Sequence, residues 1–167
     1  MNDEPASMNL FDAVTIAAEA HQTARPRDDG PYIAHPVRVM LRVAGDHARM
    51  AALLHDVVED HAEEGWTFEE LDRRGCPAEV LEALRLLTHE KPRGDRDDPA
   101  HVQRVKEDYA AYIERLASNS IARSVKLADL TDNIGDGIIP EDADTWTRGR
   151  LERYLTARER LNRKENR

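Results

Sequence analysis

The stretch AALLHDVVED, residues 51–60, decides how the rest of the chain is interpreted. It places one histidine and three acidic residues in an apolar run without lysine or arginine. Wound as an α-helix at about 100° per residue, its polar side chains share one arc of roughly 140°: His55, Asp56, Glu59 and Asp60. A solvated helix face is the usual meaning of such a pattern, but carboxylates at i and i+4 repel each other. A bound metal ion would supply the missing positive charge.

The composition favours one globular domain spanning 1–167, with its core at about 8–163. The chain has 167 residues, of which 40% are hydrophobic and 5% aromatic, so the core is expected to be aliphatic. The single cysteine, Cys76, excludes an internal disulfide and predicts a cytoplasmic protein. We expect neither a membrane span nor a signal peptide, because no apolar run approaches about 18 residues. The net charge of −9 argues against nucleic-acid binding.

The spacing of apolar residues predicts an all-α fold. Helices are expected after a Ser7 cap, from about His35 to Val43, through 51–60, from Thr67 to near Gly75, from Pro77, and at 102–117, 119–132 and 145–163. The charged stretch at about 89–101 contains two prolines and predicts a mobile surface loop. No segment shows extended β alternation.

Four separated segments carry residues suited to chemistry. They hold His35, the His55-Asp56 pair with its following acids, Asp129 with Asn133, and Arg150 with Tyr154. Two imidazoles and two carboxylates suit Mn²⁺, Fe²⁺ or Zn²⁺ better than Ca²⁺. Cys76 lies in an RGCP turn, so a thiolate zinc site is disfavoured. From spacing alone, a histidine is more often a packed or surface residue than a metal ligand.

The remaining histidines have simpler interpretations. His21 continues the apolar face of the first helix and is expected to be buried and hydrogen-bonded. The others are expected to face solvent: His47, His61, His89 and His101.

The order His…His-Asp…Asp resembles the HD superfamily of metal-dependent phosphohydrolases. The segments GPYIAHPVRV (30–39), AALLHDVVED (51–60) and VKLADLTDN (125–133) look like one branch, the hydrolase domain of RelA/SpoT enzymes. The resemblance covers about residues 10–160, and the length is similar to that of small stand-alone alarmone hydrolases. It implies a single HD-domain helical bundle that releases pyrophosphate from the 3′ position of (p)ppGpp.

The resemblance also implies a role for each motif residue. The metal ligands fall on His35, His55, Asp56 and Asp129, and the metal of the family is usually Mn²⁺, although another divalent transition metal is possible. Glu59 and Asp60 match the acidic pair that positions and deprotonates the attacking water.

Substrate-binding residues are implied in the same way. They fall on Arg25, Arg27, Lys126, Asn133, Arg150 and Tyr154. The spacing after His21 departs from that of the long enzymes, so either Arg25 or Arg27 could contact phosphate. The segment Leu130-Thr131-Asp132-Asn133 lacks the usual Arg and His, which makes an adenine alarmone such as (p)ppApp a competitor of the guanine one.

Two alternatives to alarmone hydrolysis stay open at this point. One is a phosphatase acting on NADPH or on nucleoside monophosphates. The other is a catalytically silent HD protein that senses a nucleotide or neutralises a toxin. Retention of both Glu59 and Asp60 beside four ligands favours an enzyme, since a binding protein does not need to activate water. The sequence does not indicate an oligomeric state.

Overall fold

A computed structural model of the chain describes residues 7–27, 30–135, 139 and 141–165. These residues form helices and connecting loops, without a strand, so the all-α prediction is confirmed. The helices are α1 (Leu10–Ala20), α2 (Ala34–Leu41), α3 (Asp46–Leu54), α4 (Val57–His61), α5 (Phe68–Arg73), α6 (Ala78–Leu87), α7 (Pro99–Leu116), α8 (Ser120–Ile134) and α9 (Thr145–Glu165). Short 3₁₀ turns occupy His21–Thr23 and Ala62–Glu64.

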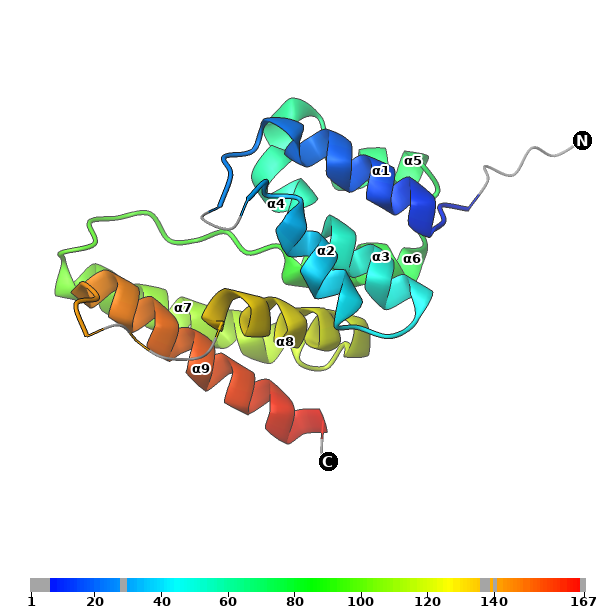
Figure 1. Ribbon diagram of the computed structural model, residues 1–167. Helices are drawn as coiled ribbons and strands as arrows, with labels where there is room; N and C mark the ends of the chain where they lie inside the picture. Colours follow the sequence, from blue (N-terminus) through cyan, green and yellow to red (C-terminus); the bar gives the residue numbers. More distant parts are fainter. Residues whose placement is uncertain (1–6, 28–29, 136–138, 140, 166–167) are drawn as a thin grey trace, which may run out of the picture.

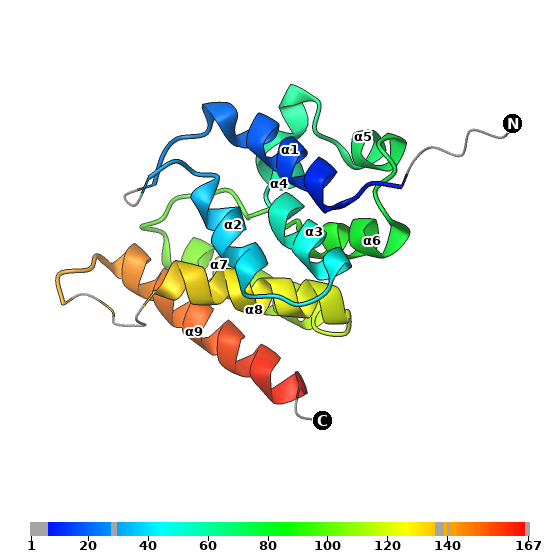
Figure 2. The ribbon, with the colours of Figure 1, turned by 45° about the vertical axis from the view of Figure 1, so that its right-hand side comes forward.

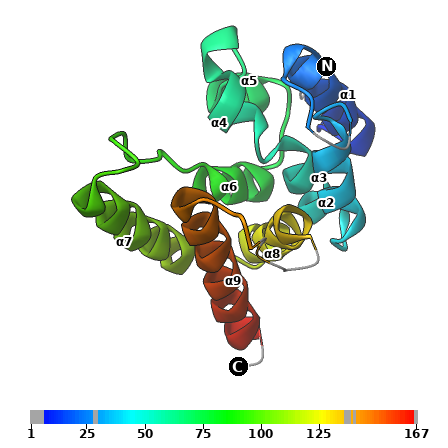
Figure 3. The ribbon, with the colours of Figure 1, turned by 60° about the vertical axis from the view of Figure 1, so that its left-hand side comes forward.

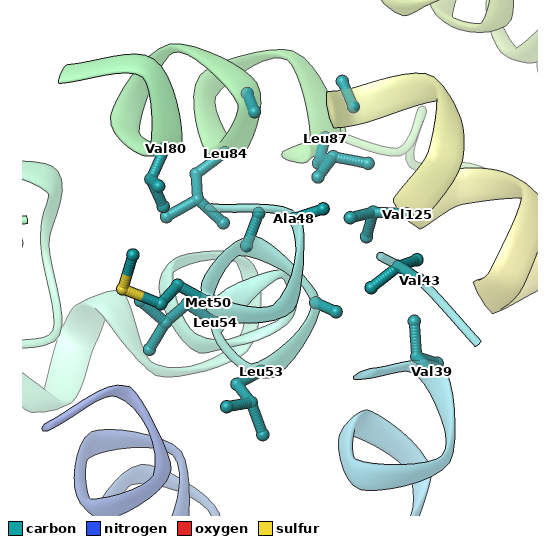
Figure 4. Packing of buried hydrophobic residues seen from close by; sticks show 14 of the residues in the cluster. Val39, Val43, Ala48, Met50, Leu53, Leu54, Val80, Leu84, Leu87 and Val125 are labelled. Carbon is teal, nitrogen blue, oxygen red and sulfur yellow. The ribbon is translucent and has the colours of Figure 1, made fainter. Parts of the chain in front are cut away.

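Helices α3 and α8 are central to the bundle. Helix α3 contacts α1, α2, α6 and α8, and α8 in turn contacts α2, α6 and α9. Figures 1 and 2 show α1 above this centre and α9 below it, and Figure 3 shows α9 beside α7. The core is aliphatic, as the composition predicts: Val80 and Leu84 of α6 point toward α3, and Leu53 lies on the opposite side of α3, between α1 and α2 (Figure 4). Val125 of α8 lies near Val43 (Figure 4). Burial of these side chains orients α2, α3 and α8 toward one another.

Local signals fix two helix starts, one of them differently from the prediction. Helix α1 is capped by Asn9 and not by Ser7: the Asn9 side chain accepts hydrogen bonds from the backbone N–H groups of Phe11 and Asp12, and the Asp12 carboxylate accepts the Asn9 N–H. This reciprocal pair satisfies amide groups that a Ser7 cap would leave open. Thr67 caps α5 by accepting the Glu70 N–H, as predicted.

The opening stretch is not one continuous helix. Helix α3 ends at Leu54, His55 and Asp56 form a turn, and α4 begins at Val57. Neighbouring side chains of a regular helix diverge by about 100°. In the structure His55 Nε2 and Asp56 Oδ2 nevertheless lie 3.2 Å apart, so these neighbouring side chains meet at the turn between α3 and α4.

The charged loop is shorter than predicted and is held at both ends. Asp98 caps α7, so the loop ends there and not at residue 101. Lys91 pairs with Glu59, and the Arg96 guanidinium lies 5.1 Å from the ring centre of Trp146. The contact with Glu59 places the loop directly beside the predicted catalytic pair.

Burial of the histidines differs from the prediction at three positions. His21 is buried, and its Nδ1 lies 3.0 Å from Nε2 of His61, so its prediction is confirmed and that for His61 is wrong. His101 is buried too, because α7 begins before it and turns it toward Gly94 and Trp146. His47 is exposed as predicted, whereas His89 is half-buried and contacts Asp108, so its prediction is wrong too.

Among the described residues, no helix is long and apolar enough to cross a lipid bilayer.

Candidate functional site

The imidazole rings of His35 and His55 both point their Nε2 atoms toward one place. His35, at the start of α2, donates its Nδ1–H to Asp132 Oδ2 at 2.8 Å, and His55 donates its Nδ1–H to the Ala52 carbonyl at 2.7 Å. An ionised carboxylate and a carbonyl can only accept, so both Nδ1 atoms carry the proton. The Nε2 atoms are thereby left as the metal-binding nitrogens.

Two carboxylates flank these nitrogens. Asp56 Oδ2 lies 3.2 Å from His55 Nε2 and 3.7 Å from His35 Nε2. Asp129 Oδ1, from α8, lies 3.2 Å from His35 Nε2 and 3.8 Å from His55 Nε2. The ligand atoms of His35, His55 and Asp56 all lie within 4.8 Å of one another, close enough to share one ion. The four residues predicted as ligands therefore converge from α2, the α3–α4 turn and α8.

Both carboxylate oxygens of Asp129 already accept hydrogen bonds within the protein. Asn133 Nδ2 donates to Oδ1, and Lys126 Nζ donates to Oδ2 at 2.8 Å. Burial alone would raise the pKa of Asp129, but the Lys126 ammonium and the two histidines hold it well below its usual value. Part of the positive charge missing from residues 51–60 therefore comes from Lys126 on the neighbouring helix.

The donor set fits a divalent transition metal. His55 is buried, and within the described part of the chain its Nε2 makes no hydrogen bond. Burial would lower the pKa of His55, but the carboxylates of Asp56 and Asp129 outweigh it and raise the pKa to about 9. Without a metal, a proton on this imidazole offsets the acids. A divalent cation can take its place and release that proton, as metal binding to histidine generally does.

Asp132 is a site residue that the sequence analysis did not identify. Besides His35, its buried carboxylate accepts two hydrogen bonds from Arg38, at 2.8 and 2.9 Å, and one from Arg42 at 3.2 Å. Burial acts to raise its pKa, but the hydrogen bonds from Arg38 and His35 lower it to about 2. The available signal was the spacing: Asp132 follows Asp129 by three residues, and Arg38 follows His35 by three.

We expect Asp132→Asn to weaken metal affinity by about 10- to 100-fold, the usual effect of losing an outer partner of a ligating histidine. The amide keeps the shape of the side chain but loses the charge that orients the His35 ring. The measurement is competition for Mn²⁺ against a calibrated chelator. Asp46→Asn is the matched control, because its side chain is 79% exposed and lies away from the site. Equal affinity for Asp132→Asn and wild type would refute this role.

A pocket of about 170 Å³ opens beside the candidate ligands. Most of the predicted residues line it: Arg27, Glu59, Asp60, Lys126, Asn133 and Tyr154. Arg27 Nη2 donates to Asn133 Oδ1 at 2.7 Å, which connects the arginine to the metal-site carboxylate Asp129. The structure does not bring Arg25 or Arg150 to the pocket; both side chains are exposed.

The predicted catalytic acids differ in their surroundings. The Glu59 carboxylate accepts two hydrogen bonds, one from the Lys91 ammonium at 2.7 Å and one from the backbone N–H of His89 at 3.1 Å. Asp60 lies at the mouth of the pocket, where partial burial and the negative charges of Asp56 and Glu59 raise its pKa. Its raised pKa makes the Asp60 carboxylate a stronger base than an ordinary aspartate.

Further pocket residues were missed, among them Tyr32 and Lys91. Tyr32 donates its hydroxyl to Asp56 Oδ2 at 2.5 Å, and Lys91 brings a cation from the charged loop. Tyr32 belongs to the PYIAHP motif that supplies His35, so the motif carried a signal. The position of Lys91 in the pocket depends on how the charged loop lies over α4, and the sequence pattern does not encode that.

Comparison with known proteins extends the motif resemblance to almost the whole chain. The chain is 30% identical over 158 residues to the bifunctional (p)ppGpp synthase/hydrolase SpoT of Escherichia coli, a match covering 91% of this chain and 22% of that protein. It is 29% identical over 158 residues to the guanosine-3′,5′-bis(diphosphate) 3′-pyrophosphohydrolase MESH1 of Drosophila melanogaster, covering 89% of this chain and 80% of that protein. No protein-family model matches the chain. The chain thus spans about a fifth of the long relative and most of the short one.

Proposed function

We propose, on the premise that this chain is a relative of the RelA/SpoT-type (p)ppGpp hydrolases, that it hydrolyses the 3′-pyrophosphate of a purine alarmone, (p)ppGpp or (p)ppApp. The observation that carries the proposal is the convergence of two histidine Nε2 atoms and two carboxylates at the wall of a pocket lined with cations. In this reading the protein is a cytoplasmic enzyme whose partner is a small nucleotide.

His35, His55, Asp56 and Asp129 would hold the metal, a divalent transition ion that suits mixed imidazole and carboxylate ligands. Mn²⁺ is the favoured ion because it is the usual metal of the family that the motifs resemble. When bound, a divalent metal supplies Lewis-acid stabilisation of charge that develops on the phosphoryl oxygens. The residues around it act on the water and the substrate.

Asp60 accepts the proton of the attacking water, and Glu59, held by Lys91 and the His89 N–H, orients that water. The water oxygen bonds to the phosphorus attached to O3′ while the P–O3′ bond breaks. Pyrophosphate leaves, and the nucleotide keeps a free 3′-hydroxyl group that receives the proton.

Three cations are available for the phosphates. Arg27 can offer a bidentate fork, and Lys91 and Lys126 act as point charges. Lys91 forms an ion pair with Glu59, and Lys126 forms one with Asp129. An anionic substrate must therefore share these two cations with the two carboxylates. Tyr154 provides an aromatic face at the same pocket.

The experiment that tests the function is a product assay with Mn²⁺ on ppGpp, ppApp, NADPH and several nucleoside monophosphates. We expect pyrophosphate release from ppGpp or ppApp to be fastest. Orthophosphate as the dominant product, from NADPH or a monophosphate, would assign a phosphatase instead. Nucleotide binding without turnover of any compound would assign a sensor.

The two arginines that the sequence left open can be separated directly. We expect Arg27→Ala to raise KM by about 10- to 100-fold, since it removes one charged hydrogen bond to phosphate. Arg25→Ala is the matched control: it removes the same charge two residues away, outside the pocket. Equal KM values for the two variants would contradict the assignment of Arg27.

A further inference from the structure

The tyrosines of this chain are gathered in one place. The sequence contains four, and all four line the candidate pocket: Tyr32, Tyr109, Tyr112 and Tyr154. Two of the hydroxyl groups are committed within the protein. Tyr32 donates to Asp56, and Tyr112 donates to the Leu87 carbonyl at 2.7 Å.

Tyr109, on α7, is different because its hydroxyl oxygen is buried and has no hydrogen-bond partner among the residues that the structure describes. Buried polar groups in proteins are almost always paired, so an unpaired one calls for an explanation. The ring is also held in place, 5.7 Å from Tyr112, 5.9 Å from Tyr154 and 5.9 Å from His89, centre to centre. The hydroxyl is therefore fixed where it stands.

The surroundings of this hydroxyl select the kind of ligand it would bind. Burial raises its pKa far above the usual value, and Lys126 is the main opposing charge, so the group is protonated at neutral pH and can donate. Lys126 itself lies 5.4 Å from the ring centre of the neighbouring Tyr112. A fixed O–H donor in the same pocket as the half-buried Lys126 ammonium favours an anionic oxygen as acceptor.

Tyr109 also lines a second pocket beside the candidate site. Besides the candidate site, it lines a groove of about 290 Å³ between α7 and α9. The groove has no other residue in common with the site. Tyr109 thus lies between the groove and the site, and the groups that act on the pKa of its hydroxyl belong to the site: Lys126 first, then Tyr154, Tyr112 and Asp129.

We propose that Tyr109 is a substrate-binding residue whose hydroxyl donates a hydrogen bond to a phosphate oxygen held near Lys126. This inference rests on the proposed function, in which the pocket takes a phosphorylated nucleotide. The substrate supplies the acceptor that the protein lacks, and the folded protein carries an unpaired hydroxyl until the substrate binds.

The test is Tyr109→Phe, which removes only the hydroxyl. We expect KM for the alarmone and the Kd for inorganic pyrophosphate, measured calorimetrically with metal-stripped protein, to rise about 10- to 100-fold. The melting temperature should stay the same or increase, because an unpaired buried hydroxyl is removed. Tyr112→Phe is the control for stability: it deletes a hydroxyl with a partner and should lower the melting temperature.

The outcomes separate this inference from the proposed function. Pyrophosphate affinity within about twofold of wild type, or a loss of affinity accompanied by a lower melting temperature, overturns the role of Tyr109. So does a wild-type protein that binds no pyrophosphate. If the wild type binds pyrophosphate through Tyr109 but hydrolyses no alarmone, the inference stands and the proposed function fails.

Discussion

Asp60→Asn is expected to slow turnover by about 10²- to 10⁴-fold, the usual contribution of a general base, while bound metal is retained. The variant keeps the size of the side chain and removes its ability to accept a proton. The four predicted ligands contact one another without the Asp60 side chain: His35, His55, Asp56 and Asp129. The substitution therefore leaves the ligand set intact. The measurement combines steady-state kinetics with elemental analysis of the purified protein.

The pH dependence of activity, compared between wild type and Asp60→Asn, tests the same role of Asp60. Asp60 accepts a proton only when ionised, and its pKa is raised above the ordinary 3.8. Activity of the wild type should therefore fall as the pH decreases through that raised pKa. Asp60→Asn should lack this acidic limb. Wild-type rates in Asp60→Asn would show that the carboxylate is only a solvated side chain, and Glu59→Gln would then be the next variant to compare.

Asp56→Ala is expected to lose both the metal and all measurable turnover. Its carboxylate contacts both histidine Nε2 atoms and accepts the Tyr32 hydroxyl, so its removal opens the centre of the ligand set. The same change removes a charge that raises the pKa of His55. Elemental analysis and the product assay measure the two losses.

Asp46→Ala, on the exposed face of α3, controls for the loss of any carboxylate. Circular dichroism separates loss of the site from loss of the fold. A folded Asp56→Ala protein with one metal per chain and normal turnover would exclude Asp56 as a ligand.

Much of the fold could be predicted from local patterns. Helices α6, α8 and α9 follow apolar spacing and caps that lie within each segment, so they appear where expected. The break at His55 could not be read in this way, because the apolar residues on both sides continue one helical pattern. The break accompanies a side-chain contact, from His55 Nδ1 to the Ala52 carbonyl, which hydrophobic periodicity does not encode.

The candidate site was predictable to the extent that motifs carried it. His35, His55, Asp56 and Asp129 stand in recognisable segments and do converge. Contacts between segments were not predictable, since they depend on which helices become neighbours. Asp132 reaches His35 because α2 lies against α8, and Lys91 reaches Glu59 because the charged loop turns back over α4. The same dependence on loop geometry left Arg25 and Arg27 undecided.

Metal dependence is the central claim, and titration of metal-stripped protein tests it most directly. Mn²⁺ would be added in steps to protein shown by elemental analysis to be metal-free, and pyrophosphate release from ppGpp or ppApp would be followed at each step. We predict no turnover without metal and a rise that saturates at one ion per chain. Full activity in the metal-free protein would contradict the account.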